Sequence, residues 1–447
     1  MYIYSRALIF VTVLAAFLSA GPTMYGQEPT PTPTPTSAAV PAAVPAAAPE
    51  WHEREELTGD WGGVRSRWKE KGVTLDFKLV LFAQGTAAGG IRRDVEGNGK
   101  FETDFKFDFG KLAGWQFWSA QLKTETRFGG PSLGGIGTLS PVNTAMLVPG
   151  LDGTDFSITA LNVTKLIPID LAKGNLVAVS VGRFKTLDLV MEDFFGGAGE
   201  SRFFHIAQNG GIVAARQIPL VTNGGSIAWV RGGVPFITFA VLDPNEHSQD
   251  AGLDNLFSDG VSFIPGINFT SKYGGKSGLH TFGAAFSTKK TTPFDALRQV
   301  IIPGPPLVPI QPKKSWSVNY TFRQYLVERG PKDGWGLFTQ VAFSNESTSP
   351  VTNFFMAGVG GNGLFKSRNR DEFGIVYSYS GLSDVLKDNI NPFGLGGRLR
   401  AEHQFETFYN FYLTPWLRLT GDLQIIRPTR PIAETAIIPG ARLEIIF

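Results

Sequence analysis

Residues 101–109 alternate with a period of two between apolar and charged side chains. Every odd position except Thr103 is Phe, and every even position is Asp, Glu or Lys. Only an extended strand separates two such sets onto opposite faces, because successive side chains of a strand point in opposite directions. Residues 118–128 repeat the pattern, with the polar residues at the odd positions. These segments therefore predict strands with one apolar and one strongly polar face.

The polar face of these strands needs water, whereas the apolar face needs an apolar environment. Four polar residues share one face of residues 118–128, namely Gln121, Lys123, Glu125 and Arg127. A sandwich core would bury such groups, and a basic residue that faces lipid at mid-depth costs roughly 2–4 kcal/mol. A closed barrel turns one face toward lipid and the other toward a water-filled lumen. The sequence thus predicts an all-β protein, a transmembrane antiparallel β-barrel.

Segments with this alternation recur along the chain and predict about sixteen strands. They span residues 73–86, 100–109, 115–128, 154–166, 175–185, 224–231, 235–242, 261–270, 279–288, 315–326, 335–344, 353–366, 371–380, 399–413, 416–427 and 436–447. Long connections such as 129–153 and 186–223 alternate with short ones such as 110–114 and 414–415. Outer-membrane barrels have long outer loops and short periplasmic turns. Sixteen strands enclose an aqueous channel, whereas eight would be filled by side chains.

The composition supports a barrel and excludes several classes of partner. The chain has 53 Gly, 36 Phe and no Cys, and its mean hydropathy is close to zero. Its 41 basic and 39 acidic residues give a net charge of only +2, which is unlike a nucleic-acid-binding surface. The lack of Cys excludes disulfides and thiolate metal sites. The five His are scattered without an i, i+4 pair, so we expect neither a metal nor a cofactor.

The N-terminal part of the chain has the pattern of an exported protein. Residues 1–26 carry Arg6 and then a short apolar stretch at 7–18, which predicts a signal peptide that is removed on export. Residues 27–56 are rich in Pro, Ala and Thr, a composition that favours a disordered leader. With a barrel following, the predicted location of the mature protein is the bacterial outer membrane.

A short helix is expected between the leader and the barrel. Residues 57–72 place Asp60 where it can cap a helix N-terminus and Gly72 just after the last turn. The predicted periplasmic helix therefore ends directly before the barrel, which is expected to span 73–447.

Three stretches of the chain carry distinctive motifs. They are LTGDWGGVRSRWKEKGV at 57–73, EHQFETFYNFYLTPWLRLTGDLQIIRP at 402–428, and a broken pattern of VGRF at 181–184, DFFGG at 193–197, SRF at 201–203 and NGG at 209–211. The first resembles the entry to the barrel in the carbohydrate-selective porin family, the OprB type. The second is similar to the last hairpin of that family, and the third resembles its constriction loop.

The resemblance implies a sixteen-stranded porin that passes glucose and related sugars. We expect no enzymatic activity. The partners it implies are sugars in transit and outer-membrane lipid, with a monomer or a homotrimer as the assembly. This chain departs from the usual constriction segment, which is shorter here and reads Gly199-Glu200-Ser201 before Arg202. It also has a Gly-rich, apolar connection at 129–153.

A constriction is expected where the 186–223 connection folds into the lumen. The residues expected to line it are Arg183, Arg202, Glu192, Asp193 and Glu200. The residues expected on the pore wall at mid-barrel are Gln121, Lys123, Glu125 and Arg127. Charged and amide groups suit a sugar because its hydroxyls both donate and accept hydrogen bonds. The alternative is that these residues form ordinary wall ion pairs without a role in transport.

Three other functions compete with a sugar-selective porin. A general porin for small hydrophilic solutes would have the same fold. A barrel enzyme would need Ser, His and an acid close together, but the pair Ser201 and His205 lacks a clear third member. No catalytic residue is therefore predicted. A structural protein tethered to peptidoglycan would use residues 27–56 as its tether.

Overall fold

The computed structural model describes residues 50–130, 135–149, 155–190, 193–210, 212–297, 309–390 and 397–447. These residues form one sheet of seventeen strands. The strands are β1 (Val73–Gly85), β2 (Ala88–Gly90), β3 (Val95–Asp108), β4 (Trp118–Gly129), β5 (Phe156–Asp170), β6 (Asn175–Lys185), β7 (Val221–Arg231), β8 (Val234–Leu242), β9 (Ser262–Tyr273), β10 (Lys276–Thr291), β11 (Lys313–Gly330), β12 (Asp333–Ser344), β13 (Val351–Asn362), β14 (Glu372–Leu382), β15 (Glu402–Thr414), β16 (Leu417–Arg427) and β17 (Glu434–Ile446). The helices are η1 (Trp61–Gly63), α2 (Val64–Glu70), α3 (Phe109–Ala113), η2 (Thr144–Leu147), η3 (Leu171–Lys173), η4 (Thr186–Leu189), η5 (Ile206–Asn209), η6 (Phe294–Ala296) and α5 (Asp384–Ile390).

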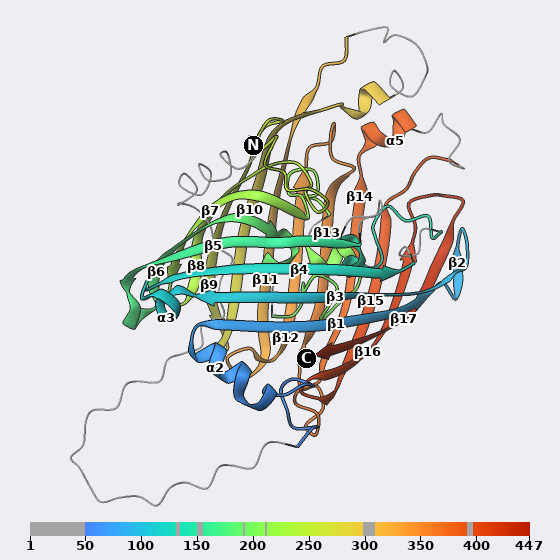
Figure 1. The fold of residues 1–447 in the computed structure, drawn as a ribbon. Helices are drawn as coiled ribbons and strands as arrows, with labels where there is room; N and C mark the ends of the chain where they lie inside the picture. Colours follow the sequence, from blue (N-terminus) through green and yellow to red (C-terminus); the bar gives the residue numbers. More distant parts are fainter. Residues whose placement is uncertain are drawn as a thin grey trace, which may run out of the picture.

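Apart from the three-residue β2, the sixteen other strands close into a barrel (Figure 1). Each strand pairs antiparallel with its neighbours along the chain, and β1 pairs with both β3 and β17, which closes the ring. The short β2 pairs only with the end of β17. This architecture confirms the predicted all-β, transmembrane antiparallel barrel of about sixteen strands.

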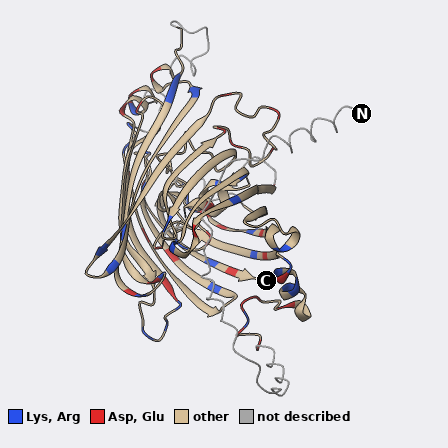
Figure 2. Cartoon of the chain, turned by 90° about the vertical axis from the view of Figure 1, so that its left-hand side faces the viewer, with Lys and Arg blue, Asp and Glu red and all other residues tan. Residues whose placement is uncertain are grey.

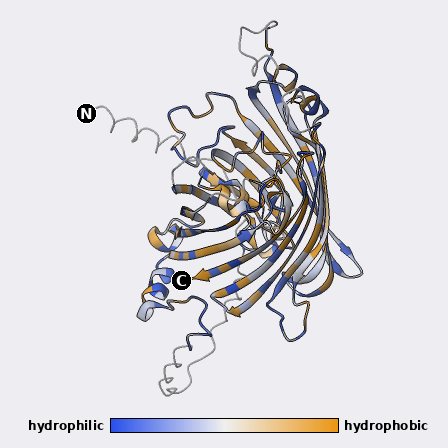
Figure 3. Cartoon of the chain, turned by 90° about the vertical axis from the view of Figure 1, so that its right-hand side faces the viewer, coloured by the Kyte–Doolittle hydropathy of each residue, from blue (hydrophilic) through white to orange (hydrophobic). Residues whose placement is uncertain are grey.

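The two faces of the strands are sorted as the alternation predicts. On β10, Phe282 and Phe286 are each 47% exposed on the outer face, whereas the inward Ala285 and Ser287 are each 2% exposed. Figure 3 shows the same sorting as alternating hydrophobic and hydrophilic bands along the strands. In Figure 2 the middle of the long strands on the left carries few Lys, Arg, Asp and Glu residues. Among the helices in the described ranges, none has the length and hydropathy to cross a membrane.

The connections differ at the two ends of the barrel. At one end, glycine pairs close the hairpins β7–β8 (Gly232 and Gly233) and β9–β10 (Gly274 and Gly275), with φ between 57° and 78°. Two-residue hairpin turns favour positive φ at both positions, which Gly adopts without steric cost. At the other end the connections are long, and residues 186–220 between β6 and β7 are an example.

The helix before the barrel lies within the predicted helical segment, 57–72. α2 covers Val64–Glu70, because Gly62 and Gly63 have φ of 66° and 86° and interrupt a regular first turn. Arg65 Nη2 donates a hydrogen bond of 2.5 Å to the carbonyl O of Phe447. This contact ties the helix to the end of the last strand.

The end of the predicted leader also contacts the barrel. Trp416 Nε1, in the turn between β15 and β16, donates a hydrogen bond of 2.8 Å to the carbonyl O of Trp51. The predicted signal peptide, 1–26, and the leader residues 27–49 lie outside the described residues.

Candidate functional site

The inner wall of β1, β3, β4 and β6 carries a cluster of paired charges. Its members are Lys78, Lys100, Glu102, Lys123, Glu125 and Lys185, called here the lysine–glutamate cluster. Lys100 Nζ lies 2.9 Å from Glu102 and 3.0 Å from Glu125, and its side chain is fully buried. Alternate positions of β3 and β4 supply these groups, so the period-two pattern brings them to one face.

Glu200 enters this cluster from the connection between β6 and β7 (residues 186–220, the β6–β7 segment). Its carboxylate lies 2.6 Å from Lys78 Nζ and 2.7 Å from Lys185 Nζ, and it also contacts Lys100. Burial and the neighbouring Glu102 act to raise the pKa of Glu200, but the three lysines outweigh them and hold that pKa well below its ordinary value. The β6–β7 segment is thus attached to one side of the inner wall.

The next residues of the β6–β7 segment are attached to a different part of the wall. Arg442 on β17 donates hydrogen bonds of 2.9 Å and 2.8 Å from Nη1 to the carbonyl O atoms of Gly199 and Arg202. Glu406 on β15 accepts a hydrogen bond of 2.5 Å from the backbone N of Phe204. The bonds from the Arg442 guanidinium are charge-assisted, and such bonds are stronger than bonds between neutral groups. These contacts hold residues 199–204 across the inner face of the barrel.

Aromatic packing holds the same segment against the wall of β11–β15. Phe194, Phe195 and Phe203 are at most 1% exposed. The ring of Phe203 lies 4.8 Å from that of Phe408 on β15, and the ring of Phe195 lies 5.1 Å from that of Phe338 on β12. Burial of each such side chain contributes roughly 1.5–3 kcal/mol. The packing is part of a larger apolar cluster inside the barrel.

A second connection, residues 135–149 between β4 and β5, packs beside the first. Val142 is buried with Ile426 and Ile438 on the inner wall of β16 and β17. The backbone N of Thr144 donates a hydrogen bond of 2.7 Å to the carbonyl O of Phe204. Two connections therefore contact each other within the barrel.

The structure separates the four expected constriction residues that it describes. Arg202 lies 3.7 Å from Glu372 on β14, and Asp193 lies 3.6 Å from Arg323 on β11. Glu200 belongs to the lysine–glutamate cluster described above. Glu192 lies outside the described residues.

Arg183 is the expected constriction residue that lies apart from the β6–β7 segment. Its backbone is in register with Leu161 on β5 and Asn223 on β7. Its Nη1 donates a hydrogen bond of 3.4 Å to the carbonyl O of Ala251, in the connection between β8 and β9. The structure therefore does not bring Arg183 together with Arg202.

The four expected pore-wall residues share the inner face of β4 and have different partners. Gln121 donates a hydrogen bond of 2.9 Å to Asp104, and Lys123 lies 2.8 Å from Asp188. Arg127 Nη1 donates a hydrogen bond of 2.9 Å to the carbonyl O of Met146. Glu125 is fully buried within the lysine–glutamate cluster.

Sequence reasoning missed the residues that attach the β6–β7 segment. They are Lys78, Lys100, Lys185, Glu406 and Arg442. Lys100 continues the alternation of residues 101–109, so its position on the polar face could be predicted from the sequence. The sequence did not predict that the β6–β7 segment contacts the polar face of β3, because no local pattern encodes a contact between distant segments.

Three carboxylates of the cluster come close enough together to suggest a cation site. Ligand atoms of Glu102, Glu125 and Glu200 lie within 4.8 Å of one another. Lysine ammonium groups lie between these carboxylates, with Lys100 in contact with all three. An added cation would be repelled by these ammonium groups, so the arrangement is a salt-bridge network rather than a set of metal ligands.

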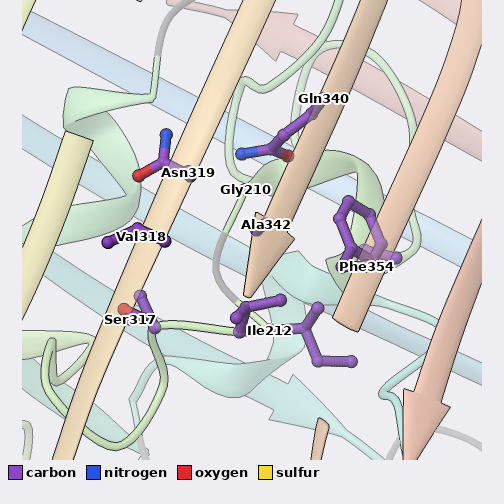
Figure 4. A pocket seen from close by; sticks show the side chains of 11 residues that line it. Gly210, Ile212, Ser317, Val318, Asn319, Gln340, Ala342 and Phe354 are labelled. Atoms are coloured by element: carbon purple, nitrogen blue, oxygen red, sulfur yellow. The ribbon is translucent and has the colours of Figure 1, made fainter. Parts of the chain in front are cut away.

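A small cavity lies between the β6–β7 segment and the wall of β11–β13. Its volume is about 20 Å³, roughly the space of one water molecule. Asn319 and Gln340 reach it from the wall and Ile212 from the segment (Figure 4). The cavity marks the edge of the area that the segment covers.

A closed barrel with an apolar outer face and a charged inner face defines an outer-membrane porin. The profile of the carbohydrate-selective porin, OprB family matches residues 92–447. The chain belongs to this family, and its location is the bacterial outer membrane. Family and fold identify a channel rather than an enzyme.

Solved structures show the same fold. The high-pH structure of Pseudomonas putida OprB matches with a TM-score of 0.73 and 19% identity, over 89% of this chain and 99% of that chain. The low-pH structure of the same protein matches with a TM-score of 0.53 and 17% identity, over the same shares of the two chains. The search of curated proteins found no match.

Proposed function

We propose that this porin passes sugars such as glucose by passive diffusion, and that the β6–β7 segment narrows its lumen. The observation that supports this is the attachment of the segment to two separate parts of the inner wall. Glu200 is bound by lysines of β1, β3 and β6, and residues 199–204 are bound by Arg442 of β17 and Glu406 of β15. A segment held in this way reduces the cross-section that is open to solutes. The family supports sugars as the solutes.

In this proposal, solutes contact the partly exposed charged side chains of the β6–β7 segment. The side chains of Arg202 and Asp193 are 17% and 13% exposed, and each is near an opposite charge of the wall. The side chain of Glu200 is only 5% exposed, so in this proposal it holds the segment in place and does not contact the solute. Paired charges offer hydrogen bonds to a neutral sugar without forming a deep trap, which passive flux requires.

The proposal is tested by single-channel recording in planar bilayers with and without D-glucose. A sugar-selective pore is expected to show a block of the ion current that saturates with glucose concentration. Replacement of Arg202 by Ala is expected to weaken this block, whereas Arg370→Ala, an exposed residue outside the lumen segments, serves as the matched control. A wild-type current that glucose leaves unchanged would favour the general porin for small hydrophilic solutes.

We also propose the processing and assembly that fit this function. Residues 1–26 are removed on export, residues 27–56 form a leader outside the barrel wall, and the mature chain assembles as a homotrimer. Sequencing of the mature N-terminus and chemical crosslinking in outer membranes test these steps.

A further inference from the structure

The inner wall of β8–β11 carries a strip of uncharged polar and glycine residues. Its members are Thr238, Gly266, Asn268, Thr281, Gly283 and Asn319, called here the β8–β11 strip. The strand register joins them: Thr238 pairs with Gly266, Gly266 with Gly283, Asn268 with Thr281, and Gly283 with Asn319. All six are partly exposed. The strip is therefore a continuous surface that faces the lumen.

The glycines of the strip let the polar side chains lie flat on the wall. A Cβ atom at Gly266 would come within 2.5 Å of Thr238 Oγ1, and one at Gly283 within 2.6 Å of Asn319 Oδ1. Any larger residue at these positions would push the hydroxyl or the amide aside. The hydroxyl of Thr281 donates a hydrogen bond of 2.6 Å to Asn268 Oδ1, which orients both groups. The result is an ordered, charge-free surface of hydroxyl and amide groups.

Comparable polar groups on the wall of β12–β15 are covered. Ser378 on β14 and Gln404 on β15 are 0% and 1% exposed. The β6–β7 segment reaches this wall directly, since Gln208 Nε2 donates a hydrogen bond of 2.9 Å to Ser378 Oγ. The charges of β1, β3 and β4 in the lysine–glutamate cluster are likewise engaged with each other and with Glu200. The open polar wall is therefore on the other side, along β8–β11.

We propose that the solute path follows the β8–β11 strip, and that the strip recognises neutral polyhydroxylated solutes. This inference rests on the proposed sugar transport, and it assigns the β8–β11 strip as the site that sugars contact. Hydroxyl and amide groups match sugar hydroxyls because both donate and accept hydrogen bonds. The absence of charge on the strip means that no ion pair retains a solute, which suits entry and release in a passive pore. The strip contains none of the constriction or pore-wall residues that the sequence predicted.

The lack of Cys in the chain allows a direct test by cysteine substitution. The variants are Thr281→Cys and Asn319→Cys on the strip, and the matched control is Ala284→Cys, which the alternation of β10 places on the lipid face. Each purified porin is reacted with a membrane-impermeant, charged methanethiosulfonate, and conductance is recorded with D-glucose as the probe. Heat-modifiable gel migration verifies that each variant is folded.

Modification is expected to lower the conductance of both strip variants severalfold more than that of the control, and glucose is expected to slow the modification. The proposal is overturned if folded strip variants do not react, or if they react with no change in conductance. It is also overturned if glucose blocks the cysteine-free channel but does not protect the strip cysteines. A channel that glucose never blocks would refute sugar transport instead, and the conductance change would still decide where the path lies.

Discussion

At the scale of single residues, Glu200 contributes most to the attachment of the β6–β7 segment, although its side chain is too buried to contact a solute. Glu200 places its carboxylate against Lys78, Lys100 and Lys185 of three different strands. With Glu200 present, the four lysines of the site are matched by Glu102, Glu125, Asp188 and Glu200. Its loss leaves one buried positive charge without a counter-charge.

Replacement of Glu200 by Gln is therefore expected to release the β6–β7 segment. Loss of one partner from a buried ion-pair network costs about 3–5 kcal/mol, because the remaining charge stays buried and uncompensated. We expect a lower urea midpoint, a higher conductance and a shift toward anion selectivity, measured by the reversal potential in a salt gradient. Glu434→Gln, at an exposed carboxylate of β17, is the control and is expected to resemble the wild type.

The same residue predicts a dependence on pH. The pKa of Glu200 in the attached segment lies well below its ordinary value of 4.5. As the pH falls, a detached segment therefore binds a proton at Glu200 before an attached one does. The contribution of Glu200 to attachment is complete above about pH 4.5 and is lost progressively below it. Conductance recorded from pH 7 to pH 3 should rise in the wild type and change less in Glu200→Gln. An identical profile in the two proteins would contradict this assignment.

At the scale of elements, β14 forms part of the surface against which the β6–β7 segment packs. A Cβ atom at Gly374 would come within 2.5 Å of the rings of both Phe203 and Phe408. Glycine at this position of the strand therefore makes room for the aromatic packing, which is the reason a poor strand former is tolerated there.

Gly374→Val is expected to displace Phe203 and destabilise the attached segment by about 1–3 kcal/mol, the usual cost of overpacking. Limited proteolysis of the folded barrel should show faster cleavage within the β6–β7 segment. Gly421→Val on β16 is the matched control, because a Cβ atom there meets nothing within 4 Å. Equal cleavage rates in the two variants would contradict the packing of Phe203 against Gly374.

At the scale of the whole molecule, the barrel depends on one seam between the first and last strands. β1 and β17 pair antiparallel from Lys78 and Ile446 to Gln84 and Gly440. The seam also holds the charges that bind the β6–β7 segment, because Lys78 and Arg442 lie on its two sides. Closure of the barrel and attachment of the segment are therefore linked.

A disulfide across this seam is expected to form between residues that lie opposite each other on β1 and β17. Ala83 and Ala441 are register partners with exposed side chains, and directly opposed residues have Cβ atoms about 4.5–5.5 Å apart. The double variant Ala83→Cys with Ala441→Cys should oxidise and migrate as a crosslinked species on denaturing gels. Ala83→Cys combined with Ala357→Cys on β13 should not crosslink within one chain. Free thiols in the first pair under oxidising conditions would contradict the pairing of β1 with β17.

The alternation of side chains was sufficient to predict the barrel. The Phe and charged residues of 101–109 already separate a lipid face from a water face, and burial alternates in the same way along long strands such as β12, β15 and β16. The same pattern placed Lys123 and Glu125 on the inner wall. The sequence did not show that Gly62 and Gly63 both adopt positive φ just before helix α2.

The candidate site was only partly predictable. The sequence pointed to the β6–β7 segment and to Arg202, Asp193 and Glu200, but grouped them with Arg183. In the structure these residues have four different partners, from Glu372 and Arg323 to the lysine–glutamate cluster and Ala251. Side chains that are close in sequence diverge in space because each turn of an irregular segment changes their direction.

The sequence alone determined which face of each strand meets lipid and which meets water, because alternation is a local property of an extended chain. Only the tertiary structure decided which part of the inner wall the β6–β7 segment covers and which part stays open. That choice depends on contacts between residues far apart in the chain, such as Glu200 with Lys78 and Arg442 with Gly199. Such contacts arise when the barrel closes, and no local pattern can record them.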